Sequence, residues 1–146
     1  MIPFTDEYFM RQALAEARAA AAEDEVPVGA VVVCNDRIIA RAHNQTERLN
    51  DPTAHAEMLA ITAAAGILGA KYLVDCTLYA TVEPCVMCAG AIAWAQIGSI
   101  VYGAPDEKKG FRRYAAGVLH PKTMVRTGIL ENECAEEMRA FFRNRR

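Results

Sequence analysis

Hydrophobic and polar positions alternate along the chain with a period that changes from segment to segment. Near the start, apolar side chains recur at helical spacing, at Met10, Leu14, Ala17 and Ala21. Thr5 precedes this stripe as a suitable N-cap, and Val26-Pro27 is a point beyond which a helix cannot continue. The pattern therefore predicts an amphipathic helix that begins after Thr5.

Short apolar runs then predict strands that alternate with further helices. The runs "VGAVVV" and "RIIARA" flank Asn35-Asp36, which is typical of a hairpin, and "TLYATV" and "SIVYG" follow as two more strands. Helices are expected from about 54 to 65, closed by Gly66, from about 86 to 95, and from about 132 to 143. An initial hairpin followed by strand–helix alternation predicts a three-layer α/β fold with a mixed central sheet.

Length and composition limit the possible classes of protein. The 146 residues suffice for one domain, 1–146, that buries roughly 70% of its unfolded surface. Hydrophobic residues make up 53% and charged residues 23%, as in ordinary globular proteins, and no apolar run approaches the roughly 18 residues of a membrane span. The N-terminus lacks the features of a secretion signal, so the five cysteines are expected to be reduced. We expect a cytoplasmic protein without a membrane partner.

Charge is distributed unevenly along the chain, although the net charge is only −2. Residues 1–103 carry 6 Lys/Arg against 12 Asp/Glu, whereas residues 104–146 carry 10 against 6. A basic C-terminal third can form an edge that binds a polyanion, and it can equally be a solvated surface.

Candidate metal ligands lie in two short motifs, "HAE" from residue 55 and "PCVMC" from residue 84. His55, Cys85 and Cys88 all fall at predicted helix N-termini, where the helix dipole favours thiolates. Two thiolates and an imidazole favour zinc. Three ligands would leave a catalytic zinc open to water, whereas a structural zinc needs a fourth. Cys34, Cys76 and Cys134 have no motif spacing to these ligands. His43 and His120 are not excluded by position, but a lone histidine is more often a hydrogen-bonded structural residue, so we expect the open site.

Two carboxylates, Glu57 and Glu83, compete for the transfer of protons at such a site. Residues two apart diverge on a regular helix, so Glu57 can face the metal beside His55 only where the chain enters the helix. Glu83 precedes Pro84 at a strand end and is better placed to bind backbone N–H groups of a turn. We therefore predict Glu57 as the catalytic acid–base.

A wider set of motifs resembles one family. His-x-Glu followed by Pro-Cys-x-x-Cys is a recognised signature of zinc deaminases. With "EVPVGAVVV", "HNQT", "DPTAHAEM", "TLYATVEPCVMCAGA" and the closing "ECAEEMRAFFRNRR", nearly the whole chain resembles bacterial tRNA-specific adenosine deaminases of the cytidine deaminase superfamily. Guanine deaminases share much of this framework, but Val28 and the Val86-Met87 pair match the tRNA enzymes.

The resemblance implies a fold, a reaction and roles for individual residues. It implies a three-layer α-β-α cytidine-deaminase-like fold and one Zn²⁺ per subunit, held by His55, Cys85 and Cys88. A zinc-activated hydroxide would convert adenosine at the first, wobble, anticodon position of tRNA to inosine, with Glu57 as proton shuttle. The implied substrate-binding residues are Asn44, Ala56, Asp106, Phe142 and Arg145. Family members are homodimers, so a tRNA anticodon stem-loop and a second copy are the expected partners.

The segment "KKGFRRYAAGVLHPKT" departs from the family pattern. Its cationic residues Lys108, Lys109, Arg112 and Arg113 alternate with Phe111 and Tyr114, a composition suited to phosphate contact and base stacking. Two other functions are compatible with the zinc motifs: deamination of a free base or nucleoside such as guanine or cytosine, and a non-catalytic zinc-stabilised binding module. The binding module would require a fourth protein ligand.

Overall fold

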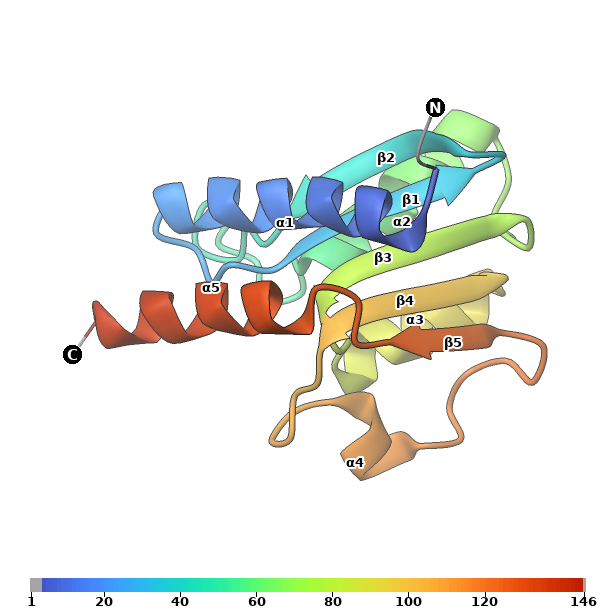
Figure 1. Ribbon diagram of the computed structural model, residues 1–146. Helices are drawn as coiled ribbons and strands as arrows, with labels where there is room; N and C mark the ends of the chain where they lie inside the picture. The colour runs from blue at the N-terminus through green and yellow to red at the C-terminus, as the bar shows by residue number, and fades with distance from the viewer. Residues whose placement is uncertain (1–3, 146) are drawn as a thin grey trace.

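A five-stranded mixed sheet runs through the middle of the protein, with helices on both faces (Figure 1). The computed structural model describes residues 4–145. The strands are β1 (Gly29–Cys34), β2 (Arg37–His43), β3 (Cys76–Val82), β4 (Ser99–Ala104) and β5 (Met124–Thr127). The helices are α1 (Asp6–Ala22), α2 (Ala56–Leu68), α3 (Val86–Ala95), α4 (Phe111–Ala115) and α5 (Glu131–Arg143).

The strand order is β2-β1-β3-β4-β5. β1 pairs antiparallel with β2 and β3, whereas β3, β4 and β5 run parallel. α1 and α5 lie on one face of the sheet, at the front in Figure 1, and α2 and α3 cover the other. The predicted three-layer α/β fold with a mixed sheet is therefore confirmed. Among the described residues, no helix has both the length and the apolarity to cross a bilayer.

Most predicted elements form where the pattern placed them. Thr5 caps α1 by accepting a hydrogen bond from the backbone N–H of Tyr8. Asn35 and Asp36 both have positive φ, as a tight hairpin turn requires. Two elements were not predicted, α4 and β5. All four β5 residues are exposed, so this edge strand has no alternation of buried and exposed positions for a sequence pattern to reveal.

The predicted end of α2 at Gly66 is wrong. The helix continues to Leu68 and ends at Gly69, which adopts the left-handed conformation with φ of 63°. Gly66 lies inside the last turns, where glycine weakens a helix but does not stop it. The left-handed residue after a helix is what favours glycine, and only Gly69 meets that requirement.

Gly66→Ala should therefore stabilise the protein. A Cβ atom there would meet nothing within 4 Å, and alanine reduces the conformational freedom of the unfolded chain. We expect the free energy of unfolding to rise by about 0.5–1 kcal/mol in urea titrations. Gly29→Ala is the contrasting variant, because its Cβ would lie 2.0 Å from the Ala13 carbonyl oxygen of α1. That variant should lose about 1–3 kcal/mol; equal effects of the two would contradict this account of the glycines.

Candidate active site

Three metal-ligating side chains meet where α2 and α3 begin. His55 is the N-cap of α2, and Cys85 is the N-cap of α3, both with extended backbone angles. Cys88 lies in the first turn of α3 and is buried. The ligand atoms of the three residues all lie within 4.8 Å of one another. Two segments that are thirty residues apart in sequence thus form one cluster.

The distances within this cluster fit a tetrahedral zinc ion. Zinc bonds of about 2.3 Å to sulfur and about 2.0–2.1 Å to nitrogen, at tetrahedral angles, separate the two atoms by about 3.6 Å. The Nδ1 atom of His55 lies 3.6 Å from the sulfur of Cys85 and 3.5 Å from that of Cys88. The two thiols and the imidazole are also a donor set that zinc prefers. The residues therefore fit the zinc that their pattern predicts.

The alternative fourth ligands of a closed site lie elsewhere. His43 is bonded to two carboxylates, and His120 accepts a hydrogen bond from the backbone N–H of Lys122. Cys34 and Cys76 face each other across β1 and β3. Within residues 4–145, no fourth His, Cys, Asp or Glu joins the cluster of three. This arrangement favours an open, catalytic site over a structural one.

The two thiols share one negative charge. A hydrogen bond from Cys88 and another from His55 lower the pKa of Cys85 to about 4, even though partial burial opposes this. The pKa of Cys88 is raised instead, because it donates to the Cys85 thiolate and is itself buried. Thiolates at a helix N-terminus are stabilised by the unpaired N–H groups there. The site thus has a ready anionic ligand for a cation.

Glu57 lies directly beside this cluster, in the first turn of α2. The side chain is buried, and its Oε1 atom has no hydrogen-bond partner. Burial is the main reason why the pKa of Glu57 is raised to about 7, and the charge of Cys85 adds to it. Because His55 is an extended cap and not a helical residue, the two side chains can face the same pocket. A buried carboxyl group with a free oxygen and a pKa near neutrality is suited to proton transfer.

Glu83 has a different role, as its position before Pro84 suggested. Its carboxylate accepts hydrogen bonds from the backbone N–H groups of Asp106 and Arg112 and from the Arg112 guanidinium, all at 3.0–3.1 Å. Burial alone would raise the pKa of Glu83, but these bonds lower it. A Cβ at Gly110 would lie 2.3 Å from the Glu83 carboxyl carbon, so this close approach requires glycine. Glu83 shapes the loop that borders the site.

A pocket of about 290 Å³ is lined by Glu57 and by two of the three ligands, His55 and Cys85. This volume is at the lower end of small-ligand sites and suits a nucleobase. Three predicted substrate-binding residues, Asn44, Ala56 and Asp106, line it. Asn44 is buried, and its Oδ1 accepts a hydrogen bond from the backbone N–H of Thr46 at 3.4 Å. The Oδ1 of Asp106 accepts from the N–H groups of Lys108 and Lys109.

The pocket also includes residues that the sequence did not single out as part of it. Met138 of α5 and Thr46 line it, and so does Lys109, which the sequence suggested only as one of several cations. Met138 is one more apolar residue on an amphipathic helix, and no sequence signal distinguishes it from the core. Its position follows from the packing of α5 against β4, which a sequence pattern does not specify.

Two further predicted contacts lie outside this pocket. Phe142 is half exposed and packs edge-on against Phe141. The Arg145 guanidinium lies 3.9 Å from the centroid of the Phe141 ring and 2.6 Å from the Asp24 carboxylate. Neither residue lines the pocket, so a contact with RNA would be made along the outer part of α5. Their role remains a prediction.

The basic segment is only partly suited to bind RNA. Phe111 is 3% exposed and packs against Tyr102, so the predicted base stacking on Phe111 is wrong. Phe111 is buried because α4, which begins there, packs against α3 and places the ring in the core cluster on that face of the sheet. Arg112 is bound to Glu83. Tyr114 remains 62% exposed, with its hydroxyl donating to the Lys108 carbonyl, and Lys109 faces the pocket.

Comparison with known proteins agrees with this site. The model of the cytidine and deoxycytidylate deaminase zinc-binding region matches residues 3–104. A tRNA-specific adenosine deaminase of Agrobacterium fabrum is 46% identical over 144 residues, which are 95% of each chain. The chloroplastic tRNA(adenine(34)) deaminase of Arabidopsis thaliana is 45% identical over 96% of this chain, which spans 12% of that longer protein.

Solved structures of two kinds have the same fold. One, from a study of A-to-I editing by tRNA:A34 deaminases at the wobble position of transfer RNA, is 45% identical with a TM-score of 0.84. It covers 89% of this chain and 98% of its own. A guanine deaminase from Nitrosomonas europaea is 28% identical with a TM-score of 0.82, over 92% of this chain and 83% of its own.

Proposed function

Because the chain belongs to the cytidine and deoxycytidylate deaminase family, we propose that it hydrolyses adenosine at the wobble position of a tRNA to inosine. The observation that carries this proposal is the 46% identity, over 95% of both chains, with a tRNA-specific adenosine deaminase. The similarity to a guanine deaminase is weaker, at 28% identity, although the two proteins share the fold, with a TM-score of 0.82. Deamination of a free base is the second candidate.

The metal cluster and the pocket together provide what hydrolysis needs. His55, Cys85 and Cys88 would hold a zinc ion, and three protein ligands would leave room for a water molecule on the ion. When bound, zinc supplies Lewis acidity and lowers the pKa of a coordinated water to about 7. Zinc binding would release the proton of Cys88, and the two thiolates would then neutralise the charge of the ion, so that a neutral base could enter the pocket without a large electrostatic cost.

Glu57 moves the protons of the reaction. Its free carboxyl oxygen accepts a proton from the attacking water and delivers it to N1 of the adenine ring. The C6–O bond forms, and Glu57 then assists proton transfer to the departing amino group. The C6–N bond breaks, and adenosine and water become inosine and ammonia. A residue that must both accept and donate protons works best with a pKa near neutrality, as burial gives Glu57.

The other pocket residues hold the nucleoside. Asn44 presents its amide group to the substrate, and the Ala56 backbone forms part of the base pocket. Asp106 acts beside the nucleotide backbone, and its bonds to two successive N–H groups fix the loop that carries Lys109. An anticodon loop is a low-cost substrate for such a pocket because its bases are already single-stranded.

Contacts with the rest of the RNA are proposed for the basic C-terminal third. Lys109 borders the pocket, where it reaches a phosphate next to the target nucleoside. Tyr114 offers an exposed ring for stacking. Phe142 and Arg145 extend this surface along α5, beyond the pocket.

Lys109→Ala should weaken RNA binding in a salt-dependent way. Each phosphate contact to single-stranded RNA contributes about −0.7 to the slope of log affinity against log salt concentration, and this variant should lose about one such contact. Titrations of an anticodon stem-loop at several salt concentrations measure the slope. Lys122→Ala is the matched control, because Lys122 lies near Gly98 at the opposite end of β4. An unchanged slope in Lys109→Ala would show that Lys109 makes no phosphate contact with the RNA.

We propose a homodimer as the working form. α2 and α3 pack against each other and both expose apolar side chains, among them Ile67, Val86 and Trp94. Trp94 is 84% exposed, which is unusual for a residue of this size unless a partner covers it. Light scattering of the purified protein measures its mass, and a monomer at working concentration would contradict this proposal.

Formation of inosine in an anticodon stem-loop with adenosine at the wobble position tests the proposed function. Guanine and free cytidine are assayed in parallel, and Glu57→Ala supplies the blank. Inosine that appears with wild-type protein and not with the variant is the expected result. Activity on a free base alone would support the second candidate function, deamination of a free base by the same zinc chemistry. Absence of activity on all three substrates by zinc-loaded protein would contradict both.

A further inference from the structure

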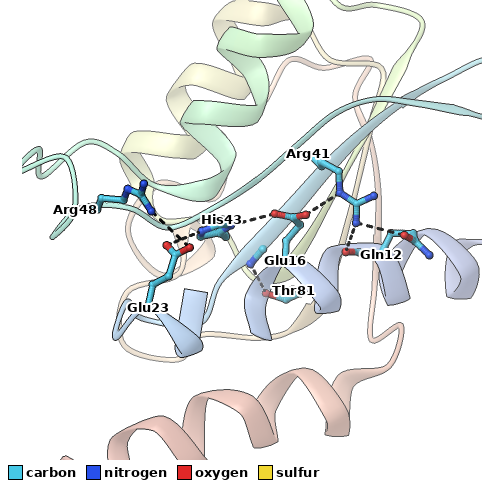
Figure 2. Close-up of polar contacts among 8 residues, drawn as sticks. Gln12, Glu16, Glu23, Arg41, His43, Arg48 and Thr81 are labelled. Atoms are coloured by element: carbon cyan, nitrogen blue, oxygen red, sulfur yellow. Dashed lines mark hydrogen bonds and ion pairs between the residues drawn. The ribbon is translucent and has the colours of Figure 1, made fainter. Parts of the chain in front are cut away.

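A second cluster of charged side chains lies between α1 and the end of β2, outside the pocket (Figure 2). At its centre is His43, the last residue of β2, with 15% of its side chain exposed. Its Nδ1 atom lies 3.1 Å from Glu16 of α1, and its Nε2 atom lies 3.1 Å from Glu23 at the C-cap of α1. We propose that His43, as an imidazolium held between these two carboxylates, is a positioning residue that fastens Asn44 in the substrate pocket.

The geometry itself requires the charged form of His43. An ionised carboxylate can only accept hydrogen bonds, so a ring nitrogen at this distance must carry a proton. A neutral imidazole has one N–H, whereas His43 has a carboxylate oxygen at each nitrogen. Loss of a proton would therefore leave a lone pair facing a carboxylate and break one of the two contacts.

The surrounding charges determine which contact is weaker. Glu16 also accepts a hydrogen bond of 2.7 Å from Arg41, so it keeps a cationic partner without His43. Within residues 4–145, the second cation beside Glu23 is Arg48, at the longer distance of 3.8 Å. α2, which packs against β2 as well, has Glu57 as its one titratable residue, and Glu57 lies in the pocket. The His43–Glu23 contact is thus the one whose loss is least compensated.

This contact bears on the pocket through the segment that follows His43. Residues 44–55, here called the β2–α2 loop, begin with Asn44 and end with the zinc ligand His55. Asn44 and Thr46 line the pocket. The buried Glu25 carboxylate accepts hydrogen bonds from the backbone N–H groups of Glu47 and Arg48. The start of the loop is therefore held to the end of α1 at two places, by His43 and by Glu25.

Release of His43 should affect substrate binding more than chemistry. The metal ligands and Glu57 lie at the starts of α2 and α3, whereas His43 ties the end of β2, directly before Asn44, to α1 and its C-cap. If the loop is correctly placed in only a fraction of molecules, the apparent affinity falls to that fraction of its full value. We expect KM to rise about fivefold for a fraction of about 0.2, with kcat changed less than about twofold.

The pH range of this effect follows from the direction of the shift. Burial alone would lower the pKa of His43, but the hydrogen bonds to Glu16 and Glu23 raise it above its ordinary value. A raised pKa means that the contact is fully present below about pH 6.5 and is lost as pH rises through the higher folded value. KM should therefore rise on the alkaline side.

NMR of the zinc-loaded full chain with ¹⁵N-labelled histidine tests the charge of His43 directly. Both ring nitrogens should remain protonated above the ordinary histidine pKa of about 6.5. The backbone N–H groups of Glu47 and Arg48 should exchange with solvent several-fold faster in His43→Gln. A ring that titrates below that value, or exchange rates equal to those of wild type, would overturn the inference without reference to activity.

Steady-state kinetics on the anticodon stem-loop at fixed ionic strength tests the consequence, which rests on the proposed function. His43→Gln should have a raised KM that no longer depends on pH, and Glu23→Gln should shift the alkaline rise of KM to lower pH. Glu7→Gln is the control, because Glu7 forms an exposed pair with Arg11 in the first turn of α1. A wild-type KM profile in both His43→Gln and Glu23→Gln would overturn the inference even in an active enzyme. If wild-type protein makes no inosine, the proposed function fails, while the NMR and exchange results still decide the role of His43.

Discussion

Replacing Glu57 by glutamine should reduce kcat/KM for inosine formation by about 10²–10⁴-fold, the usual contribution of a positioned acid–base. Glutamine has nearly the same shape but cannot accept a proton from water or deliver one to the base. The other two carboxylates that line the pocket, those of Glu83 and Asp106, accept hydrogen bonds from backbone N–H groups of the neighbouring loop, whereas the Oε1 atom of Glu57 has no partner. The loss should appear mainly in kcat, since proton transfer occurs on the way to the transition state and not on binding.

Metal content distinguishes this role from a structural one. Zinc measured by atomic emission should stay at one ion per chain in Glu57→Gln, because the three ligands are other residues. Glu107→Gln is a matched control at an exposed carboxylate of the neighbouring loop and should keep wild-type activity. Loss of zinc in proportion to activity would show that Glu57 holds the site together. Activity within tenfold of wild type would exclude Glu57 as the main proton carrier.

The candidate site was largely predictable because its chemistry lies in two contiguous motifs. The sequence spacing predicts which side chains lie at the same helix N-terminus: His55 with Glu57, and Cys85 with Cys88. The position at a helix N-terminus also determines the direction in which each side chain points. The sequence did not determine how far apart the N-termini of these two helices lie. In the fold, α3 connects the parallel strands β3 and β4 and packs against α2, and this packing brings the two N-termini together.

Other parts of the site depend on packing that leaves no mark in the sequence. Met138 reaches the pocket only because α5 crosses the end of β4, and its spacing on the helix is that of any core residue. For Phe111 the sequence was misleading. An aromatic residue among cationic ones suggested stacking on RNA bases, but the fold buries its side chain. The charged cluster around His43 could not be predicted from the sequence, because the two carboxylates that bind this histidine are 20 and 27 positions away.

Cys85→Ala should lose both zinc and activity, and it should lose more activity than Glu57→Gln. Water bound to zinc has a pKa of about 7 instead of about 15.7, which raises the hydroxide available at neutral pH by about eight orders of magnitude. A general acid–base contributes far less, so activity should fall by at least about 10⁴-fold when the ion is lost. Cys85 is the ligand to remove because it is the N-cap of α3 and its sulfur lies 3.6 Å from the Nδ1 atom of His55, so its loss leaves too few ligands to hold the ion.

Cys34→Ala is the matched control, since Cys34 is a half-buried thiol opposite Cys76 on β1 and β3, away from the ligands. It should keep one zinc ion and near wild-type activity. A chelator should inactivate the wild-type protein, and added zinc should restore it and raise its melting temperature, because a ligand that binds only the folded state stabilises it. Full activity in Cys85→Ala, or in chelated wild-type protein shown to be free of metal, would contradict a zinc-dependent reaction. Because Cys85→Ala leaves Glu57 in place and Glu57→Gln leaves the ligands in place, the two variants together separate activation of water from transfer of its proton.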